Sequence, residues 1–207
     1  MAGRARRPEV PAEGAGSPRS RPGRTAPPVG RARAHDGDDD DPDGEATLDT
    51  AEFRRVMGHF ATGVTVVGTR RPSDDLPCAL TANAVASVSL DPMLVLVCVD
   101  RSADSHDCLL DSGIFSINIL AEDHERYARR FSSWDIERKF EGIAYRTETT
   151  GAPVLAGVLG WVDCRVVGTH PGGDHTIVIG EVVAGDADPR VGTPLIYYRS
   201  GYARLAL

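Results

Sequence analysis

The sequence predicts a mainly β protein, an antiparallel barrel with a few peripheral helices. Six segments are rich in apolar and β-branched residues, at residues 64–69, 78–90, 93–99, 114–120, 160–169 and 176–184. The connections between them are too short, and contain too few helices, for repeated βαβ units. No GxGxxG motif follows a strand, which argues against a Rossmann dinucleotide-binding domain. A closed, mainly antiparallel barrel therefore fits the pattern best.

The chain divides at about residue 46. Residues 1–46 contain seven of the fourteen prolines and almost nothing apolar larger than valine, so we expect a tail without fixed structure. Its arginines could touch nucleic acid or anionic lipid. An upstream extension or a misplaced start is the favoured interpretation, because no apolar face accompanies these arginines. Residues 47–207 form the predicted domain.

Three short helices are expected around the strands. Thr47 or Asp49 can cap the first, and its apolar side chains repeat at the i, i+3, i+4, i+7 spacing of one helix face: Phe53, Val56, Met57 and Phe60. This face is predicted to pack on the core. The other two helices are expected at residues 105–110 and 122–131, the latter with a charged outer face.

Alternation within the strands predicts which side chains are buried. In residues 114–120, Phe115, Ile117 and Ile119 point to one side while Ser116 and Asn118 point to the other, the period of a half-buried strand. The apolar segment at residues 154–159 suits either a subunit interface or a core strand.

Composition excludes several classes of protein. The 207 residues, 41% of them hydrophobic and with a net charge of -7, suit one globular domain and exclude a basic nucleic-acid binder. Lys139 is the only lysine and follows no glycine-rich run, so there is no Walker A loop. No secretory signal is evident, and the longest apolar run, at residues 93–99, is too short to span a bilayer. We expect a cytoplasmic protein.

The cysteines and histidines do not form a metal motif. Cys78, Cys98, Cys108 and Cys164 lie far apart without a CxxC pair, so buried reduced thiols are expected. His59, His106, His124 and His170 have no second ligand at metal spacing, and His35 lies in the tail, so no metal is expected. GxSxG, HExxH and EF-hand motifs are also absent.

Three polar clusters are candidate ligand sites. The first, at residues 80–92, places small hydroxyl and amide side chains on a strand, which would let a flat heterocycle approach the backbone. Its serines could equally be the outer face of a half-exposed strand. The second, at residues 100–106, combines an arginine, two serines and the start of a helix, which suits a phosphate but also an ordinary helix cap. The third, at residues 172–175, sets an aspartate beside a histidine in a tight turn, and alone would be a hairpin loop.

In order and spacing, these clusters resemble the flavin reductase family, the small reductase components of two-component flavin monooxygenases. The resemblance covers residues 47–207. It rests on FRRVM at residues 53–57 with GVTVV at 63–67, LTAN at 80–83 with SVSLDP at 87–92, GIF at 113–115 with NIL at 118–120, and GDHT at 173–176 with GEV at 180–182. It implies the FMN-binding split barrel, a Greek-key-like antiparallel barrel.

The resemblance also implies a set of site residues. Those expected on the isoalloxazine and ribityl parts of the flavin are Thr81, Ala82 and Asn83, with Ser87, Val88 and Ser89 on its other edge. Those expected around the phosphate are Asp100, Arg101, Ser102 and Ser105. Lys139 stands where the family usually has arginine and would supply a cation for the phosphate or for a second flavin. Asp174 and His175 match a motif beside the nicotinamide, with Tyr202 near that region. Ala84 replaces a common serine, which removes one possible hydrogen bond to the flavin.

The implied reaction is hydride transfer from nicotinamide C4 to flavin N5, for which positioning is the main task. His175 would orient the carboxamide or favour the anionic reduced flavin. The implied cofactors are FMN or FAD and NADH or NADPH, with NADH preferred because no basic residue is evidently placed for a 2′-phosphate. The implied partners are a second copy of the chain and a separate monooxygenase.

Two other functions are compatible with the same fold. One is a non-catalytic flavin-binding module, which would have no reason to keep the Gly173-Asp174-His175 sequence. The other is a different split-barrel oxidoreductase, acting on pyridoxamine phosphate or using a deazaflavin. It would need a substrate-anion pocket that the sequence does not reveal.

Overall fold

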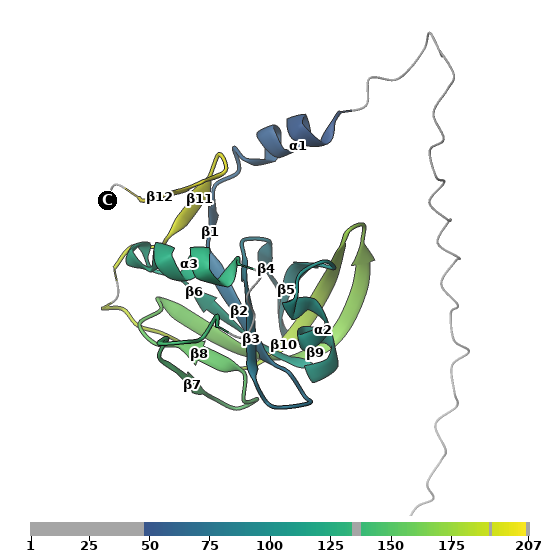
Figure 1. The fold of residues 1–207 in the computed structure, drawn as a ribbon, viewed down its shortest axis with the longest axis vertical. Coiled ribbons are helices and arrows are strands. Elements are labelled where there is room, and N and C mark those ends of the chain that lie inside the picture. Colours follow the sequence, from purple (N-terminus) through teal and green to yellow (C-terminus); the bar gives the residue numbers. More distant parts are fainter. Residues whose placement is uncertain (1–47, 134–137, 191, 206–207) are drawn as a thin grey trace, which may run out of the picture. The chain divides into compact units, whose positions relative to one another are not determined.

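The computed structural model describes residues 48–133, 138–190 and 192–205 (Figure 1). They belong to one structural unit, Thr47–Leu207. The segment at residues 1–46, with its predicted lack of structure, lies outside the described residues. Within the described residues, no helix is both long and apolar enough to cross a membrane.

Seven strands form one antiparallel sheet in the order β3-β2-β6-β9-β10-β5-β4. Their bounds are β2 (Thr65–Arg70), β3 (Pro77–Ala82), β4 (Val85–Leu90), β5 (Met93–Asp100), β6 (Ile114–Ile119), β9 (Gly160–Gly172) and β10 (His175–Ala187). Every predicted strand segment is found, but residues 78–90 form two strands instead of one. Because β3 and β4 are the outer strands of this order, the barrel is split between them instead of closed by a continuous ladder.

Shorter strands complete the architecture. β1 (Thr62–Gly63), β11 (Ile196–Tyr198) and β12 (Gly201–Ala203) form a three-stranded sheet, and β7 (Tyr145–Thr147) pairs with β8 (Pro153–Leu155). Sequence patterns did not predict β1, β7, β11 and β12, because two or three residues are too few to establish a period. The strand β8 overlaps the segment at residues 154–159, for which a core strand is one of the two interpretations.

The three expected helices are present, as α1 (Thr50–Met57), α2 (Ser105–Ser112) and the turn η1 (Glu122–His124) that leads into α3 (Glu125–Phe131). Asp49 caps α1 by accepting a hydrogen bond from Glu52 N at 2.7 Å. However, α1 has no buried residue, and Phe53 and Phe60 are 55% and 71% exposed. The prediction that its apolar face packs on the core is therefore wrong within this chain. Figure 1 shows α1 standing beyond the strands of the barrel.

The core consists of two clusters that share β2. Val67 packs with Leu80, Phe115 and Val178 in one cluster, while its neighbour Val66 packs with residues such as Leu155 in the other. Adjacent side chains of a strand point to opposite faces, so β2 is buried on both. Gly180 lies against the ring of Phe115, where an added Cβ would come within 2.4 Å of Cζ. A glycine is therefore needed there.

The strand β6 is buried on both faces, so the predicted half-buried alternation is wrong. Ser116 and Asn118 are fully buried because β8 satisfies them: Ser116 Oγ donates to Pro153 O at 2.6 Å, and Asn118 Oδ1 accepts from Leu155 N at 2.8 Å. Ile119, expected inside, is 41% exposed. The segment at residues 154–159 contributes buried core side chains, which resolves that alternative in favour of the core.

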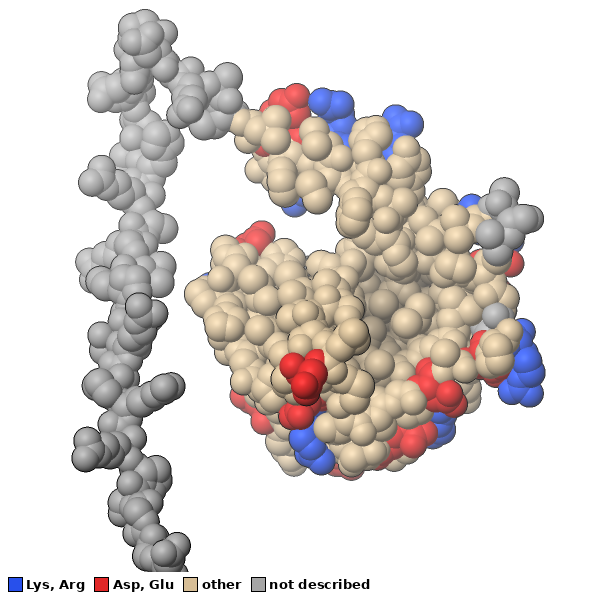
Figure 2. Space-filling view, turned by 180° about the vertical axis from the view of Figure 1, so that it is seen from behind, with Lys and Arg blue, Asp and Glu red and all other residues tan. Residues whose placement is uncertain are grey.

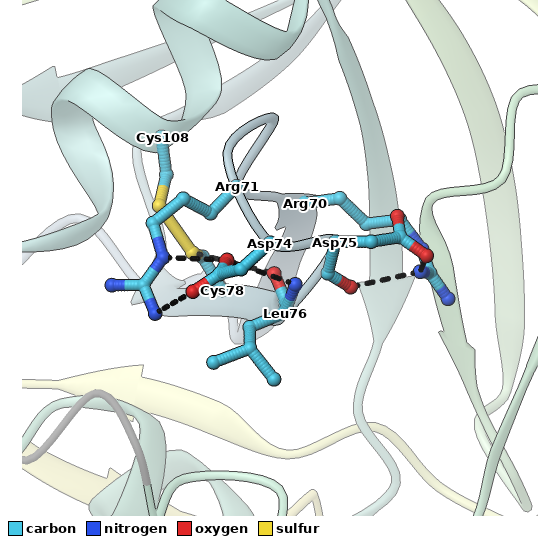
Figure 3. A network of polar contacts seen from close by, with 7 residues as sticks. All are labelled: Arg70, Arg71, Asp74, Asp75, Leu76, Cys78 and Cys108. Carbon is cyan, nitrogen blue, oxygen red and sulfur yellow. Dashed lines mark hydrogen bonds and ion pairs between the residues drawn. A yellow bond between two sulfur atoms is a disulfide. The ribbon is translucent and has the colours of Figure 1, made fainter.

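A disulfide joins Cys78 of β3 to Cys108 of α2, which corrects the expectation of four reduced thiols (Figure 3). The two residues are 30 positions apart, and only the packing of α2 on β3 brings them together. Cys98 and Cys164 are free thiols. Burial, with the nearby Asp163 carboxylate, raises the pKa of Cys164 to about 12.

Candidate functional site

A hollow of about 290 Å³ lies among the end of β3, the end of β5 and the end of α3. It is lined by residues from all three polar clusters of the sequence, together with Cys98, residues 131–133 and Lys139. The full lining is Leu80, Thr81, Ala82, Asn83, Ala84, Cys98, Asp100, Ser102, Ala103, Asp104, Phe131, Ser132, Ser133, Lys139 and His175. The fold thus brings seven of the candidate site residues into one place: Thr81, Ala82, Asn83, Asp100, Ser102, Lys139 and His175.

One wall of the hollow is the end of β3 and the connection to β4. Thr81 Oγ1 donates to Ala128 O at 2.7 Å, and Asn83 Nδ2 donates to Thr62 Oγ1 at 3.1 Å, which ties this wall to α3 and β1. Ala82 lies between these two residues and Ala84 follows them, and their small methyl groups leave space in front of the wall. Such a surface admits a flat ring system, with few polar groups to orient it.

The opposite wall is the turn between β5 and α2. Asp100 Oδ1 accepts hydrogen bonds from Ser102 N and Ser102 Oγ, both at 2.8 Å. These bonds stabilise the carboxylate and lower the pKa of Asp100 below its usual value. The Ser102 hydroxyl is therefore held at the rim of the hollow.

Beneath these walls, two side chains share one acceptor. Lys139, only 4% exposed, donates from Nζ to Ala79 O at 3.0 Å, and Ser105 Oγ donates to the same oxygen at 2.8 Å. Lys139 lines the hollow, whereas Ser105 is fully buried beside it and does not. The hollow therefore has a buried cation at its inner end.

The third element is the hairpin turn between β9 and β10. Gly173 has a φ of +73°, a conformation that glycine adopts without strain. The turn places His175 opposite Asp100 in the β5–β10 ladder. His175 Nδ1 lies 2.7 Å from Asp174 Oδ1, and this bond to the imidazole lowers the pKa of Asp174. A carboxylate only accepts hydrogen bonds, so Nδ1 of His175 carries the proton that Asp174 accepts. In a neutral His175, Nε2 is therefore free of a proton and can accept a hydrogen bond.

Several candidate residues are not among those that line the hollow. Ser87, Val88 and Ser89 lie on β4, at the sheet edge, and Arg101 donates its backbone N–H to Asp174 O at 3.0 Å. Tyr202 lies on β12, with its ring 5.6 Å from that of Tyr197 and under the Arg129 guanidinium at 5.0 Å. Asp174 supports His175 from outside the lining set.

Sequence reasoning also missed part of the lining. Phe131, Ser132 and Ser133 come from the end of α3, and Cys98 from β5. Phe131 reads as an ordinary apolar helix position, and the two serines follow it without a motif. No local signal identifies them, because α3 reaches the hollow only through its packing on β3.

The hollow is lined by small side chains, the Lys139 cation and the oriented imidazole of His175. Such a site is suited to a flat, anionic organic ligand. Residues 57–206 match the family described as flavin reductase like domain. The chain belongs to this family, and its fold is the expected split barrel.

Named relatives extend this assignment. The chain is similar to HsaB, the reductase subunit of a flavin-dependent monooxygenase from Mycobacterium tuberculosis, with 38% identity over 158 residues, covering 76% of this chain and 83% of HsaB. It is 41% identical over 159 residues to a flavin reductase (NADH) of Kitasatospora aureofaciens, covering 76% and 82% of the two chains. Among solved structures, the NADH:FAD oxidoreductase SgcE6 of Streptomyces globisporus, in complex with NAD and FAD fragments, matches with a TM-score of 0.71 and 34% identity over 76% of this chain and 93% of that chain.

Proposed function

We propose that this protein is an NAD(P)H-dependent flavin reductase, which transfers a hydride from NADH to FMN or FAD. The observation that carries the proposal is that His175 and the small-residue wall at residues 80–84 line the same hollow. Such an arrangement lets two flat rings lie between a backbone wall and an imidazole. Membership of the flavin reductase like family and the names of its relatives support the same reaction.

The hollow suits a flavin in shape and charge. Ala82 and Ala84 leave room beside the wall, and the Lys139 ammonium can attract a phosphate. The Ser102 hydroxyl donates its one proton to Asp100, so it would contact the phosphate only after leaving that bond. Thr81, Ala82 and Asn83 would hold the ring and ribityl parts. When bound, the flavin supplies N5 as the acceptor of the hydride from nicotinamide C4.

The chain itself contributes positioning. His175, held by Asp174, would orient the nicotinamide carboxamide by accepting its N–H at Nε2. When protonated on both nitrogens, it would instead stabilise negative charge on the reduced ring. We also propose contacts of these ligands with Ser87, Val88, Ser89, Arg101 and Tyr202. Ser105 is fully buried and donates to Ala79 O, so it would support the site beside Lys139 without touching the ligand. Reaching β4 and β12 would require a ligand that extends beyond the hollow or a second subunit.

We infer a preference for NADH over NADPH. Among the described residues that line the hollow, Lys139 is the only lysine or arginine, and it would serve the flavin phosphate. No guanidinium is then left there for a 2′-phosphate. Two of the named relatives are NADH enzymes by their printed names.

We further propose that the protein is a homodimer that supplies reduced flavin to a separate monooxygenase. The apolar side chains of α1 are exposed, as is Leu90 at 87%, and a second copy would cover them. The face in Figure 2 carries few charged side chains at its centre, with most of them at its margin. The monooxygenase partner rests on relatives such as HsaB, which is a reductase subunit by name.

Stopped-flow absorbance tests the proposal. The protein is mixed with each pairing of NADH or NADPH with FMN or FAD, and bleaching of the oxidised-flavin band is followed. We expect one preferred pair, and a rate at least about tenfold lower in His175→Ala. His170→Ala, on β9 and outside the lining set, is the control and should match wild type. Flavin binding without bleaching by either nucleotide would overturn the reductase and favour a flavin-binding module.

A further inference from the structure

His106 is a buried histidine that the proposed reaction leaves without a role. It lies in the first turn of α2, and its side chain is 11% exposed. Nδ1 lies 2.8 Å from Asp107 Oδ1, and Nε2 lies 2.9 Å from Thr176 Oγ1, on a strand 70 residues further along the chain. Because a carboxylate only accepts, Nδ1 carries a proton, and the ring is held at both nitrogens.

Thr176 directly follows His175 on β10. Successive side chains of a strand point to opposite faces, so Thr176 points away from the hollow when His175 points towards it. Accordingly Thr176 is 8% exposed and bonds to His106, whereas the His175 side chain is 39% exposed and lines the hollow. A displacement of Thr176 would therefore turn or move His175.

The other end of the link is α2, which is fastened to β3. Ser105 Oγ donates to Ala79 O, and Cys108 is bonded to Cys78, so two consecutive residues of β3 hold this helix. The same strand continues into the flavin-facing residues 80–82. Thus α2 is attached to β3 on one side and, through His106, to β10 on the other.

Two further backbone contacts join the end of β5 and the turn before α2 to the β9–β10 hairpin. Arg101 N donates to Asp174 O at 3.0 Å, and Asp100 pairs with His175 in the ladder. They hold the end of the hairpin to the turn. The His106–Thr176 bond instead links the helix itself to the strand below His175.

We propose that His106 is a positioning residue, which acts through Thr176 to set the separation of His175 from the flavin-facing wall of β3. Hydride transfer requires two rings at near-contact distance, so this separation affects the transfer step more than the binding of flavin alone. The inference rests on the proposed function.

The first test compares Thr176→Val with Thr176→Ser in single-turnover bleaching of flavin at saturating nicotinamide nucleotide. Valine has a similar shape to threonine but no hydroxyl. We expect the rate of bleaching to fall about tenfold, which corresponds to the loss of one hydrogen bond. The flavin Kd should change less than about threefold. The serine keeps the hydroxyl and should stay within about twofold of wild type. In a His175→Ala background, Thr176→Val should lower the rate less than about twofold, since its effect passes through His175.

The second test changes the histidine and remains informative if Thr176→Val does not fold. A glutamine at residue 106 can place its amide near Nε2 and reach Thr176, whereas an asparagine mimics Nδ1 and cannot. His106→Gln should retain most of the rate, and His106→Asn should fall about tenfold, with native circular dichroism in both.

Three results would overturn the inference. The first is an unchanged rate in folded Thr176→Val or folded His106→Asn. The second is a tenfold effect of Thr176→Val that persists in the His175→Ala background. The third is a wild-type protein that bleaches no flavin, which overturns the proposed function itself and this inference with it.

Discussion

The helices α1 and α2 have the same length, eight residues, but opposite relations to the rest of the chain. In α1 the N-cap is satisfied by Asp49, and the apolar residues follow a clear helical period, yet none of them is buried. In α2 the side chain of the N-cap residue Asp104 makes no capping hydrogen bond, yet four residues are buried: Ser105, His106, Cys108 and Leu109. Local pattern therefore predicts that a helix forms, whereas burial depends on the surface that lies opposite.

The two helices are also attached differently. The disulfide and two side-chain hydrogen bonds attach α2 to β3 and β10. At the C-terminal end of α1, Gly58 O accepts a hydrogen bond from Arg199 N at 2.7 Å. We expect α2 to resist local opening and α1 to gain its stability from a second copy.

Among the tests of this difference between α1 and α2, removal of the disulfide is expected to lower stability most. It closes a loop of 30 residues, so Cys108→Ser should lower the free energy of unfolding by about 3–4 kcal/mol, by restoring freedom to the unfolded chain. Urea unfolding, without reductant, measures this. Cys98→Ser, which removes a free thiol, is the matched control. Equal midpoints for Cys108→Ser and wild type would show that the cross-link does not hold α2.

Truncating one apolar residue on each helix should give unequal effects. Leu109 is fully buried, so Leu109→Ala should cost about 3 kcal/mol through lost burial and a cavity. Val56 is 49% exposed, so Val56→Ala should cost less than about 0.5 kcal/mol in dilute protein.

Val56, on the exposed face of α1, also tests the proposed dimer. The apparent unfolding temperature of wild type should rise with protein concentration if a second copy covers α1, and Val56→Asp should remove that dependence. Light scattering gives the mass directly. A monomeric wild type, or a Val56→Asp protein with unchanged self-association, would contradict the assignment of α1 to the interface.

Substitutions at the N-caps of α1 and α2 should give a smaller difference in the free energy of unfolding than the truncations of Leu109 and Val56. Asp49 Oδ1 accepts from Glu52 N, so Asp49→Ala should cost about 1 kcal/mol. Asp104 makes no cap hydrogen bond, so Asp104→Ala should change the free energy of unfolding by less than about 0.5 kcal/mol. Urea unfolding of the two variants, compared at one protein concentration, measures the difference. Equal losses would contradict the assigned caps.

The effect expected to be smallest near neutral pH concerns α3, whose N-cap is His124. This residue is 8% exposed and its Nδ1 has no hydrogen-bond partner among the described contacts; burial lowers the pKa of His124 below its usual 6.5. The unfolded chain therefore binds a proton more readily than the folded chain, and stability should fall as the pH drops below 6.5.

His124→Phe should remove this contribution, which is at most about 1.4 kcal/mol per pH unit for one proton. The measurement is the free energy of unfolding between about pH 7 and 5. His170→Gln, at an exposed position, is the control. An identical pH slope in His124→Phe and wild type would show that the ring titrates normally.

Much of the fold could be predicted from sequence because most strands here are long enough to show a period. The errors fall where tertiary contacts reverse a local preference. Ser116 and Asn118 alternate with apolar residues like an exposed face, but β8 accepts and donates their hydrogen bonds and buries them. The candidate site was only partly predictable for the same reason, since Ser132 and Ser133 reach the hollow through the packing of α3.

By itself, the sequence determined the class of fold, the segments that form the seven-stranded sheet and the three polar clusters. These depend on side-chain periodicity and turn residues, which act over a few positions. Only the tertiary structure decided that β3 and β4 are the edges of the split, that Cys78 meets Cys108, and that Lys139 and His175 line one hollow. Those juxtapositions depend on which apolar faces pack together, and no local pattern specifies the partner of a face.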